Sequence, residues 1–218
     1  ATRKRWMAKL KSPLSIQIPL VDPERFLLAT QKYVKPLFSP LFALIWSTLI
    51  ISMLVLVGQH WDELSANVSD RMLAADNLLL LWLVYPVIKL LHELGHGYCV
   101  KRCGGEVHEL GIMLLVLIPM PYIDASAASA FADKKQRMLV GAAGILVELF
   151  IAALAMLVWA NAEPGLAKSI AYNIIFIAGV STVLVNGNPL LRFDGYYILA
   201  DYLEIPNLGQ RANQYWAW

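Results

Sequence analysis

The sequence predicts an all-α membrane protein with about four transmembrane helices and one re-entrant or β-hairpin segment. Composition is the first reason: 58% of the 218 residues are hydrophobic and only 16% are charged, whereas a water-soluble domain carries about a quarter charged residues. The second reason is that four apolar stretches are each about 20 residues long, which is the length that crosses a bilayer as a helix. The third is the uneven distribution of basic residues between the connections.

The four apolar stretches cover residues 39–59, 77–99, 138–160 and 169–189. A further apolar run lies within residues 106–123, but Pro119 and Pro121 interrupt it. This run is too short to span a bilayer as a straight helix. We therefore expect a re-entrant or hairpin segment packed against the helices, because such backbone needs protein or water around it.

Charge divides the chain into three parts: a basic N-terminal segment, 1–38, a membrane core, 39–203, and a C-terminal segment, 204–218. Eight of the 18 Lys and Arg residues precede the first span. The positive-inside rule then predicts that the N-terminus, residues 100–137 and the C-terminus lie on the cytoplasmic side. Since the second and fourth spans both run inward, polar motifs at their ends are expected to meet. The chain begins without Met, and we expect it to be part of a longer polypeptide.

The motif HELGHG, residues 92–97, places ionisable side chains in the second apolar stretch. His92 and His96 are four residues apart, so on a helix they share one face, and two imidazoles at this spacing bind one zinc ion. Glu93 is positioned to take a proton from zinc-bound water. Structural histidines bonded to neighbouring helices are the alternative. Because ionisable groups inside membranes are usually functional, we predict Zn²⁺ and hydrolysis of an amide bond.

A catalytic zinc ion needs a third protein ligand and an open position. Asp194 is the first candidate; it lies in NPLLRFDGYY, at the end of the fourth span. Pro189 should end the helix there, and Gly195 allows the backbone to pass close to the metal. An ion pair between Asp194 and Arg192 is the alternative interpretation, and Asp124 is the second candidate for the ligand.

Together, HELGHG on one predicted helix and NPLLRFDGYY near the end of a later one resemble the site-2 protease family of intramembrane zinc metalloproteases. The bacterial branch of peptide zinc metalloproteases is the nearest likeness, and the resemblance covers residues 78–203. It implies that His92, His96 and Asp194 bind zinc and that Glu93 is the catalytic base. It also implies an edge strand that pairs with unfolded substrate, which we place at residues 106–116.

Three further polar residues are candidates for supporting roles around the metal or the substrate. Lys89 lies four residues before Glu93 and can pair with it or reach the headgroups. Glu148 is a lone acid in the third span and needs a partner, such as Lys89 or the free N–H of a zinc-bound histidine. Asn188 either caps the broken helix end or donates a hydrogen bond to the oxyanion. Small residues at 141–144 would let the third span approach the HELGHG helix closely.

The resulting prediction is a zinc metalloendopeptidase that cleaves a peptide bond in or near a membrane segment of a protein or peptide substrate. We expect a multi-pass protein of the bacterial inner membrane, with its active site toward the cytoplasm and no nucleic-acid partner. A non-proteolytic, metal-stabilised subunit of a peptide export or secretion complex is the alternative, and an export partner is expected in that case. A transporter is disfavoured, because transporter folds commonly contain internal repeats and none is visible.

Overall fold

The computed structural model describes residues 15–115 and 118–216. Within these residues, four helical segments are long and apolar enough to cross a membrane. They are α3 (Pro40–Gln59), α6 (Ala75–Arg102), α7 (Lys134–Asn161), and the segment Leu166–Asn186, in which α8 (Leu166–Ala178) continues into the π-helix η3 (Gly179–Asn186). The four predicted stretches are confirmed, and α6 and α7 each extend beyond the predicted bounds at both ends.

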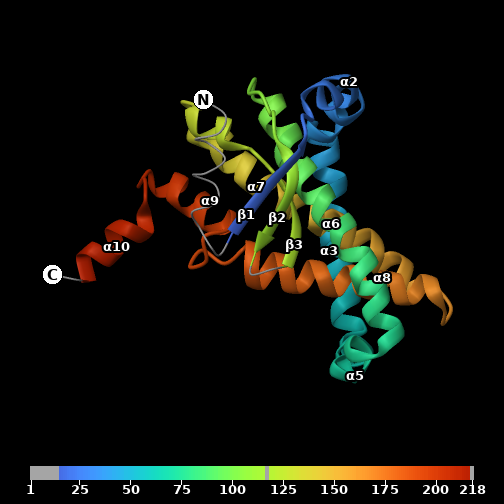
Figure 1. Ribbon diagram of the computed structural model, residues 1–218. Helices are drawn as coiled ribbons and strands as arrows, with labels where there is room; N and C mark the ends of the chain where they lie inside the picture. The colour runs from blue at the N-terminus through green and yellow to red at the C-terminus, as the bar shows by residue number, and fades with distance from the viewer. Residues whose placement is uncertain (1–14, 116–117, 217–218) are drawn as a thin grey trace.

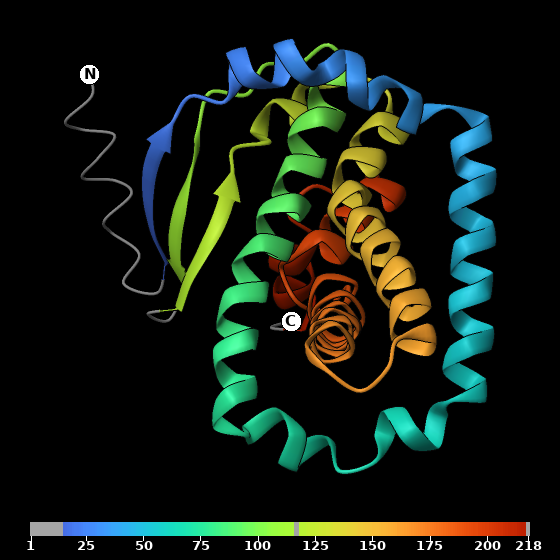
Figure 2. The same cartoon turned by 90° about the vertical axis from the view of Figure 1, so that its right-hand side faces the viewer.

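The long helices pack around α7. Figure 2 shows α3, α6 and α7 side by side along the page, whereas α8 is seen nearly end-on and crosses them steeply. On one side, α3 contacts α7 through Trp46, whose Nε1 donates to the Leu146 carbonyl at 3.0 Å, and through Phe42, whose ring centroid lies 5.3 Å from that of Phe150. No residue of α3 is buried, as expected for a helix that faces lipid on its other sides.

A three-stranded antiparallel sheet lies beside the helices, in the order β1 (Ser15–Val21), β2 (Leu110–Leu115), β3 (Ile118–Ile123). The predicted hairpin is therefore present as β2 and β3, so the described fold is not purely helical. The strand β1 was not predicted, because residues 1–38 were treated only as a basic segment. Since β1 and β3 flank β2 on its two sides, the prediction that residues 106–116 form the edge strand is wrong.

The two prolines of β3 sit on the side of the strand that faces away from β2. Asp124 N donates to the Glu109 carbonyl at 2.9 Å, whereas Ile123 N donates to Glu93 Oε2 at 2.9 Å. Successive backbone N–H groups alternate in direction along a strand, so Pro119 and Pro121 face outward with Ile123. Proline is tolerated there because no bond of the ladder is lost.

At one end of the long helices lies α2 (Glu24–Val34), which crosses the end of α6 (Figure 2). Leu27 of α2 is fully buried in a cluster with Cys99, Val100 and Val107. The 3₁₀ turn η1 (Lys35–Phe38) joins α2 to α3. At the opposite end, the short helices α4 (Trp61–Ser65) and α5 (Val68–Leu73) connect α3 to α6 (Figure 1).

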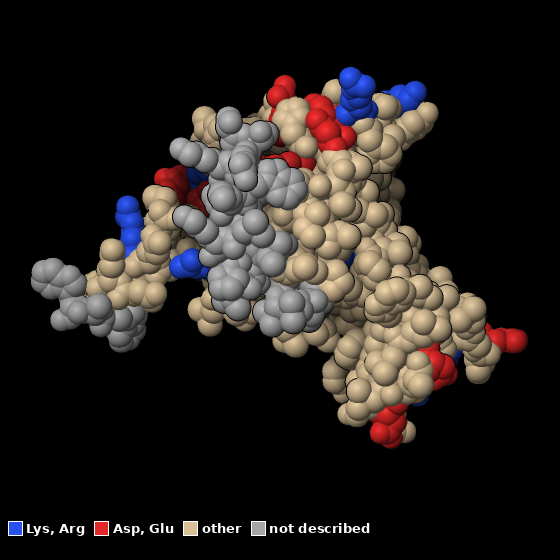
Figure 3. Space-filling view, in the orientation of Figure 1, with Lys and Arg blue, Asp and Glu red and all other residues tan. Residues whose placement is uncertain are grey.

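The remaining elements lead to and from the last long helices. The 3₁₀ turn η2 (Ser126–Ala130) joins β3 to α7, and α9 (Asp194–Leu203) and α10 (Leu208–Trp216) follow η3. On the face that Figure 3 shows, the described charged side chains gather mostly toward the ends of the helices, and the surface between them carries few charged side chains. This distribution and the four apolar helices indicate a membrane protein.

Candidate metal centre

Three side chains from two separate helices converge at one point. His92 and His96 lie on α6, and their Nε2 atoms are 3.0 Å apart. Asp194 is the first residue of α9; its Oδ2 lies 3.1 Å from His92 Nε2 and its Oδ1 lies 3.5 Å from His96 Nε2. One ligand atom from each of the three residues lies within 4.8 Å of the others. The structure thus brings together the three residues that the sequence singled out as metal ligands.

The backbone after η3 makes this convergence possible. The chain turns back on itself so closely that a Cβ on Gly195 would lie 2.6 Å from the Gly187 carbonyl oxygen, so only glycine fits at position 195 without a shift. The turn places Asp194 at the N-terminus of α9, where the helix dipole favours a carboxylate. Asp194 pairs there with the histidines and not with Arg192, which is exposed.

The helix α7 forms the wall behind the two histidines. His96 Nδ1 lies 2.7 Å from the Val140 carbonyl oxygen; because a carbonyl only accepts, Nδ1 carries the proton and the lone pair of Nε2 faces the site. Gly144 faces the same two rings, and an added Cβ would clash with Nε2 of both His92 and His96. The predicted close approach of the small residues of α7 is therefore present at Gly144.

A buried polar cluster supports His92 from its other side. Glu148 is fully buried, and its Oε1 lies 3.0 Å from His92 Nδ1 and accepts a hydrogen bond from Lys89 Nζ at 2.6 Å. Thr182 Oγ1 donates to Glu148 Oε2 at 2.5 Å, and Lys89 Nζ also donates to Ser181 Oγ. Lys89 therefore pairs with Glu148 and not with Glu93, which was one of the alternatives considered from the sequence.

The sequence analysis did not identify Ser181 and Thr182. Both are buried and lie on the π-helical part of the fourth span, where they complete the hydrogen bonds of Lys89 and Glu148. The only signal in the sequence is a pair of adjacent hydroxyl residues inside an apolar stretch. That signal is weak, because Ser and Thr in a membrane helix usually bond to the backbone of their own helix.

The three converging side chains fit a zinc ion. Ligand atoms held at 2.0–2.1 Å from a tetrahedral zinc ion are about 3.3–3.4 Å apart, and the contacts between these residues measure 3.0, 3.1 and 3.5 Å. Asp194 Oδ2, which lies 3.1 Å from His92 Nε2, is buried and has no hydrogen bond of good geometry within the described residues. Two imidazoles and one carboxylate form a donor set typical of catalytic zinc, with a fourth position left for water or substrate.

The three converging side chains differ in solvent exposure. The side chains of His92 and His96 are only 5% and 9% exposed, whereas that of Asp194 is 20% exposed. Asp194 is therefore the most accessible of the three residues.

The other predicted site residues have different surroundings. Glu93 Oε2 accepts a hydrogen bond from Ile123 N, which ties this side chain to the end of β3. Asp124 is exposed and its Oδ1 accepts from Ser126 N at 3.0 Å; the structure does not bring it to the three converging residues. Asn188 Oδ1 accepts from Leu190 N at 2.9 Å, which forms a local turn.

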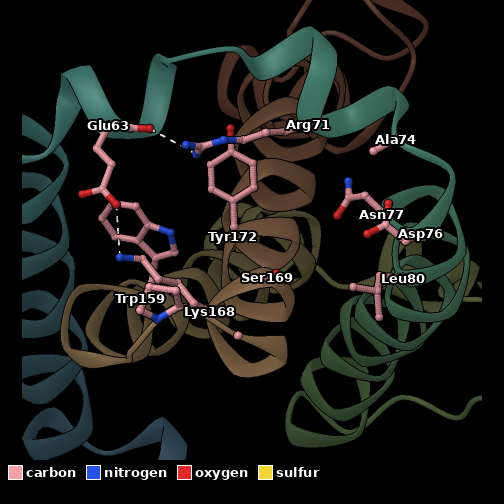
Figure 4. A pocket seen from close by; sticks show the side chains of 12 residues that line it. Glu63, Arg71, Ala74, Asp76, Asn77, Leu80, Trp159, Lys168, Ser169 and Tyr172 are labelled. Atoms are coloured by element: carbon pink, nitrogen blue, oxygen red, sulfur yellow. Dashed lines mark hydrogen bonds and ion pairs between the residues drawn. The ribbon is translucent and has the colours of Figure 1, made fainter.

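A cavity of about 460 Å³ lies at the α4–α5 end of the helices, and none of the three converging residues lines it. Three of its charged residues are in contact, as Figure 4 shows: Lys168 Nζ lies 3.1 Å from Glu63 Oε1, and Arg71 donates to the Glu63 backbone carbonyl at 3.2 Å. Lys168 also lies over the ring of Trp159, and Arg71 over that of Tyr172. These contacts hold the α4–α5 connection against α7 and α8.

Comparison with known proteins adds one distant similarity. The chain is 23% identical over 186 residues to a protein of Bacillus subtilis (strain 168) named "Putative peptide zinc metalloprotease protein YydH". The match covers 85% of this chain and 72% of that protein. No protein-family model matches the chain, and no solved structure matches it. The similarity and the converging His92, His96 and Asp194 point in the same direction, toward a zinc metalloprotease.

Proposed function

We propose that the chain is an intramembrane zinc metalloendopeptidase of the site-2 protease type. It would hydrolyse a peptide bond in or near a membrane segment of a protein or peptide substrate. The observation that carries this proposal is the convergence of two imidazole Nε2 atoms and one carboxylate from α6 and α9, at distances that suit zinc. The similarity to a protein named as a zinc metalloprotease supports it.

In this proposal, His92, His96 and Asp194 hold the metal ion, which supplies a Lewis acid and lowers the pKa of bound water to about 7. Glu93 holds the proton that leaves the water and delivers it to the departing amine. The hydrogen bond from Ile123 N to Glu93 Oε2 orients the carboxylate that would take that proton. Glu148 positions His92, since a carboxylate beside Nδ1 keeps the proton there and leaves the lone pair of Nε2 toward the metal.

The strand that presents the substrate in this proposal is β3. A peptide bond inside a helix has its backbone groups bonded within the helix, so the substrate must be extended before it is cut. Within the described residues, β3 is an edge strand. Pro119 and Pro121 have no N–H group, so Ile123 carries the N–H that points away from β2, and this N–H is already bonded to Glu93. The outward carbonyls of β3 at Pro119 and Pro121 remain available, so a substrate strand would act mainly as donor.

We place the site toward the cytoplasmic side of a bacterial inner membrane. Lys101 and Arg102 end α6, and Lys134 and Lys135 begin α7, so these four basic residues lie at the same end of the helices as α2. The opposite end carries acidic residues in the α4–α5 connection, including Asp62, Glu63 and Asp70. The positive-inside rule then orients the α2 end toward the cytoplasm.

Zinc quantification on purified protein, combined with a search for substrates, tests the proposal. The wild-type chain and the Glu93→Gln variant should each retain about one zinc ion per chain, whereas His92→Ala and Asp194→Ala should lose it. Peptide fragments that appear in the membrane proteome with wild type should be absent with Glu93→Gln. A metal-stabilised export subunit without proteolytic activity would instead function equally well with Glu93→Gln.

A further inference from the structure

A second cavity, of about 340 Å³, lies between α6, the α8–η3 segment and β3. We call it the side chamber. From α6 it is lined by Leu81, Tyr85 and Lys89, which are spaced four residues apart and therefore share one face of the helix. The next turn of that helix carries His92 and Glu93. The side chamber thus runs along α6 up to the converging side chains that the proposed function uses.

The other walls of the side chamber also lead directly to the site. Phe193, which lines it, is the residue before Asp194. Met120, which lines it from β3, is three residues before Ile123, whose N–H is bound to Glu93. Phe193 and Met120 thus connect the lining of the side chamber, along the chain, to residues of the proposed catalytic centre. An extended peptide advances about 3.3 Å per residue, so a substrate bound along β3 would place a side chain near its cleaved bond within reach of the chamber.

The chemistry of the side chamber is apolar despite the presence of Lys89. The Lys89 side chain is buried, and its ammonium group is bonded to Ser181, which also lines the chamber, and to Glu148, which does not, so its charge is already paired. Most of the remaining lining is aliphatic or aromatic, including Ile177 and Val180 on the α8–η3 segment. A charged substrate side chain would find no free partner of opposite charge among the described lining residues.

The volume of the side chamber favours a substrate with a large side chain. An engineered protein cavity of about 150 Å³ accommodates benzene, and the side chamber has more than twice that volume. A substrate with a small side chain would leave most of it unfilled. In apolar pockets, each missing methylene lowers kcat/KM by about 10-fold or more, so the difference between alanine and a bulky side chain should be large.

We propose that the side chamber receives a bulky apolar side chain of the substrate, aliphatic or aromatic, close to the cleaved bond. This inference rests on the proposed function and makes it more specific. The substrates would be peptides or membrane segments in which leucine, methionine or phenylalanine lies beside the cleavage site, and a segment rich in glycine, alanine or serine at that point would be a poor substrate.

A pair of matched variants on η3 tests the proposal. Val180→Phe adds bulk to the side chamber, whereas Val183→Phe adds the same bulk at a position that is 64% exposed and does not line it. The probe is a defined library of synthetic apolar peptides in detergent micelles, with cleavage sites read by mass spectrometry. Wild type and Val183→Phe should prefer leucine, methionine or phenylalanine beside the cleaved bond. Val180→Phe should lose at least 10-fold in kcat/KM on those peptides and shift toward alanine and glycine, with unchanged zinc content.

Binding to an inactive protein separates failure of this proposal from failure of the proposed function. Two labelled peptides that differ only by phenylalanine or alanine at the varied position are titrated onto Glu93→Gln. The phenylalanine peptide should bind at least 10-fold more tightly, and adding Val180→Phe should remove that difference. Equal affinity for the two peptides, or a preference that survives Val180→Phe, would overturn the side-chamber proposal. If the binding preference is present but wild type cleaves no peptide that Glu93→Gln leaves intact, the proposed protease function fails instead.

Discussion

Gly144 of α7 faces the Nε2 atoms of His92 and His96 so closely that one added methyl group would overlap both of them. These are the atoms proposed to bind zinc, and the methyl group would lie against the lone pair that each of them would offer to the metal. The position of a glycine on a neighbouring helix therefore decides whether the two histidines can share an ion.

We expect Gly144→Ala to abolish zinc binding. The displaced rings cannot retreat freely, because His96 Nδ1 is bonded to Val140 and His92 lies against Glu148. Zinc per purified chain should fall at least 10-fold relative to wild type. Gly141→Ala is the matched control on the same helix, since its Cβ would lie 3.0 Å from the flexible Ile198 side chain and at an ordinary contact distance of 3.9 Å from the Asp194 carbonyl oxygen. Full zinc content in Gly144→Ala would show that the histidines bind the metal elsewhere.

Asp194→Asn should lose zinc, and Asp124→Asn should keep it. Only Asp194 lies within reach of both imidazoles, whereas Asp124 is engaged in a local turn with Ser126. Replacing a carboxylate by an amide removes the negative charge of the ligand with little change in shape. Zinc content measured on both purified variants distinguishes the two candidate ligands that the sequence left open. Loss of zinc in Asp124→Asn with retention in Asp194→Asn would reverse the assignment.

The parts of the fold that depend on local sequence were predictable. The four long helices follow from length and composition alone, and the shared face of His92 and His96 follows from a spacing of four residues within one helix. The place of Asp194 was predicted only as a turn after Pro189, and the turn itself depends on the close approach of Gly195 to Gly187. Such an approach is a tertiary contact, which no local pattern encodes.

The parts that depend on distant pairing were missed. The apolar alternation of Ile16, Ile18 and Leu20 is typical of a strand, but its partner β2 lies about ninety residues later in the chain. The edge strand that the resemblance implies was therefore placed at residues 106–116, whereas β2 is the central strand of the described sheet. Ser181 was missed for a related reason, since its partner Lys89 is on another helix.

The position of α2 should depend on pH through Glu24. Its carboxylate accepts hydrogen bonds from Lys101 Nζ at 2.5 Å and from Val107 N at 2.9 Å. The hydrogen bond from Lys101 is the main cause that holds the pKa of Glu24 below its ordinary value of 4.5, followed by the bond from Val107. A lowered folded-state pKa means that this stabilisation is complete above about pH 4.5 and is lost as the pH falls through the folded-state value.

Thermal unfolding of wild type and Glu24→Gln across pH 7 to 4 measures that contribution. The variant should be less stable at neutral pH, and the difference should shrink on acidification. Because the charge of His108 also acts on Glu24, both proteins carry His108→Gln, which removes the titration of His108 from the difference. Glu163→Gln, at an exposed carboxyl in the α7–α8 connection, should show no comparable effect. A difference between wild type and Glu24→Gln that stays constant down to pH 4 would contradict the role given to this carboxylate.

The pair formed by Lys89 and Glu148 should affect stability and zinc affinity separately. Their side chains are 5% and 0% exposed, so Glu148→Gln leaves a buried ammonium without its counter-charge, which destabilises a protein by about 3–5 kcal/mol. It also removes the carboxylate beside His92 Nδ1, and loss of such a group lowers metal affinity by about 10–100-fold.

The double change Lys89→Met with Glu148→Leu should recover most of the stability, because apolar groups of similar volume often replace a buried ion pair without loss. Zinc affinity, measured by competition with a chromophoric chelator, should remain low in the double variant, since no carboxylate is left to orient His92. Recovery of zinc affinity together with stability would instead mean that the pair only holds α6 and α7 together.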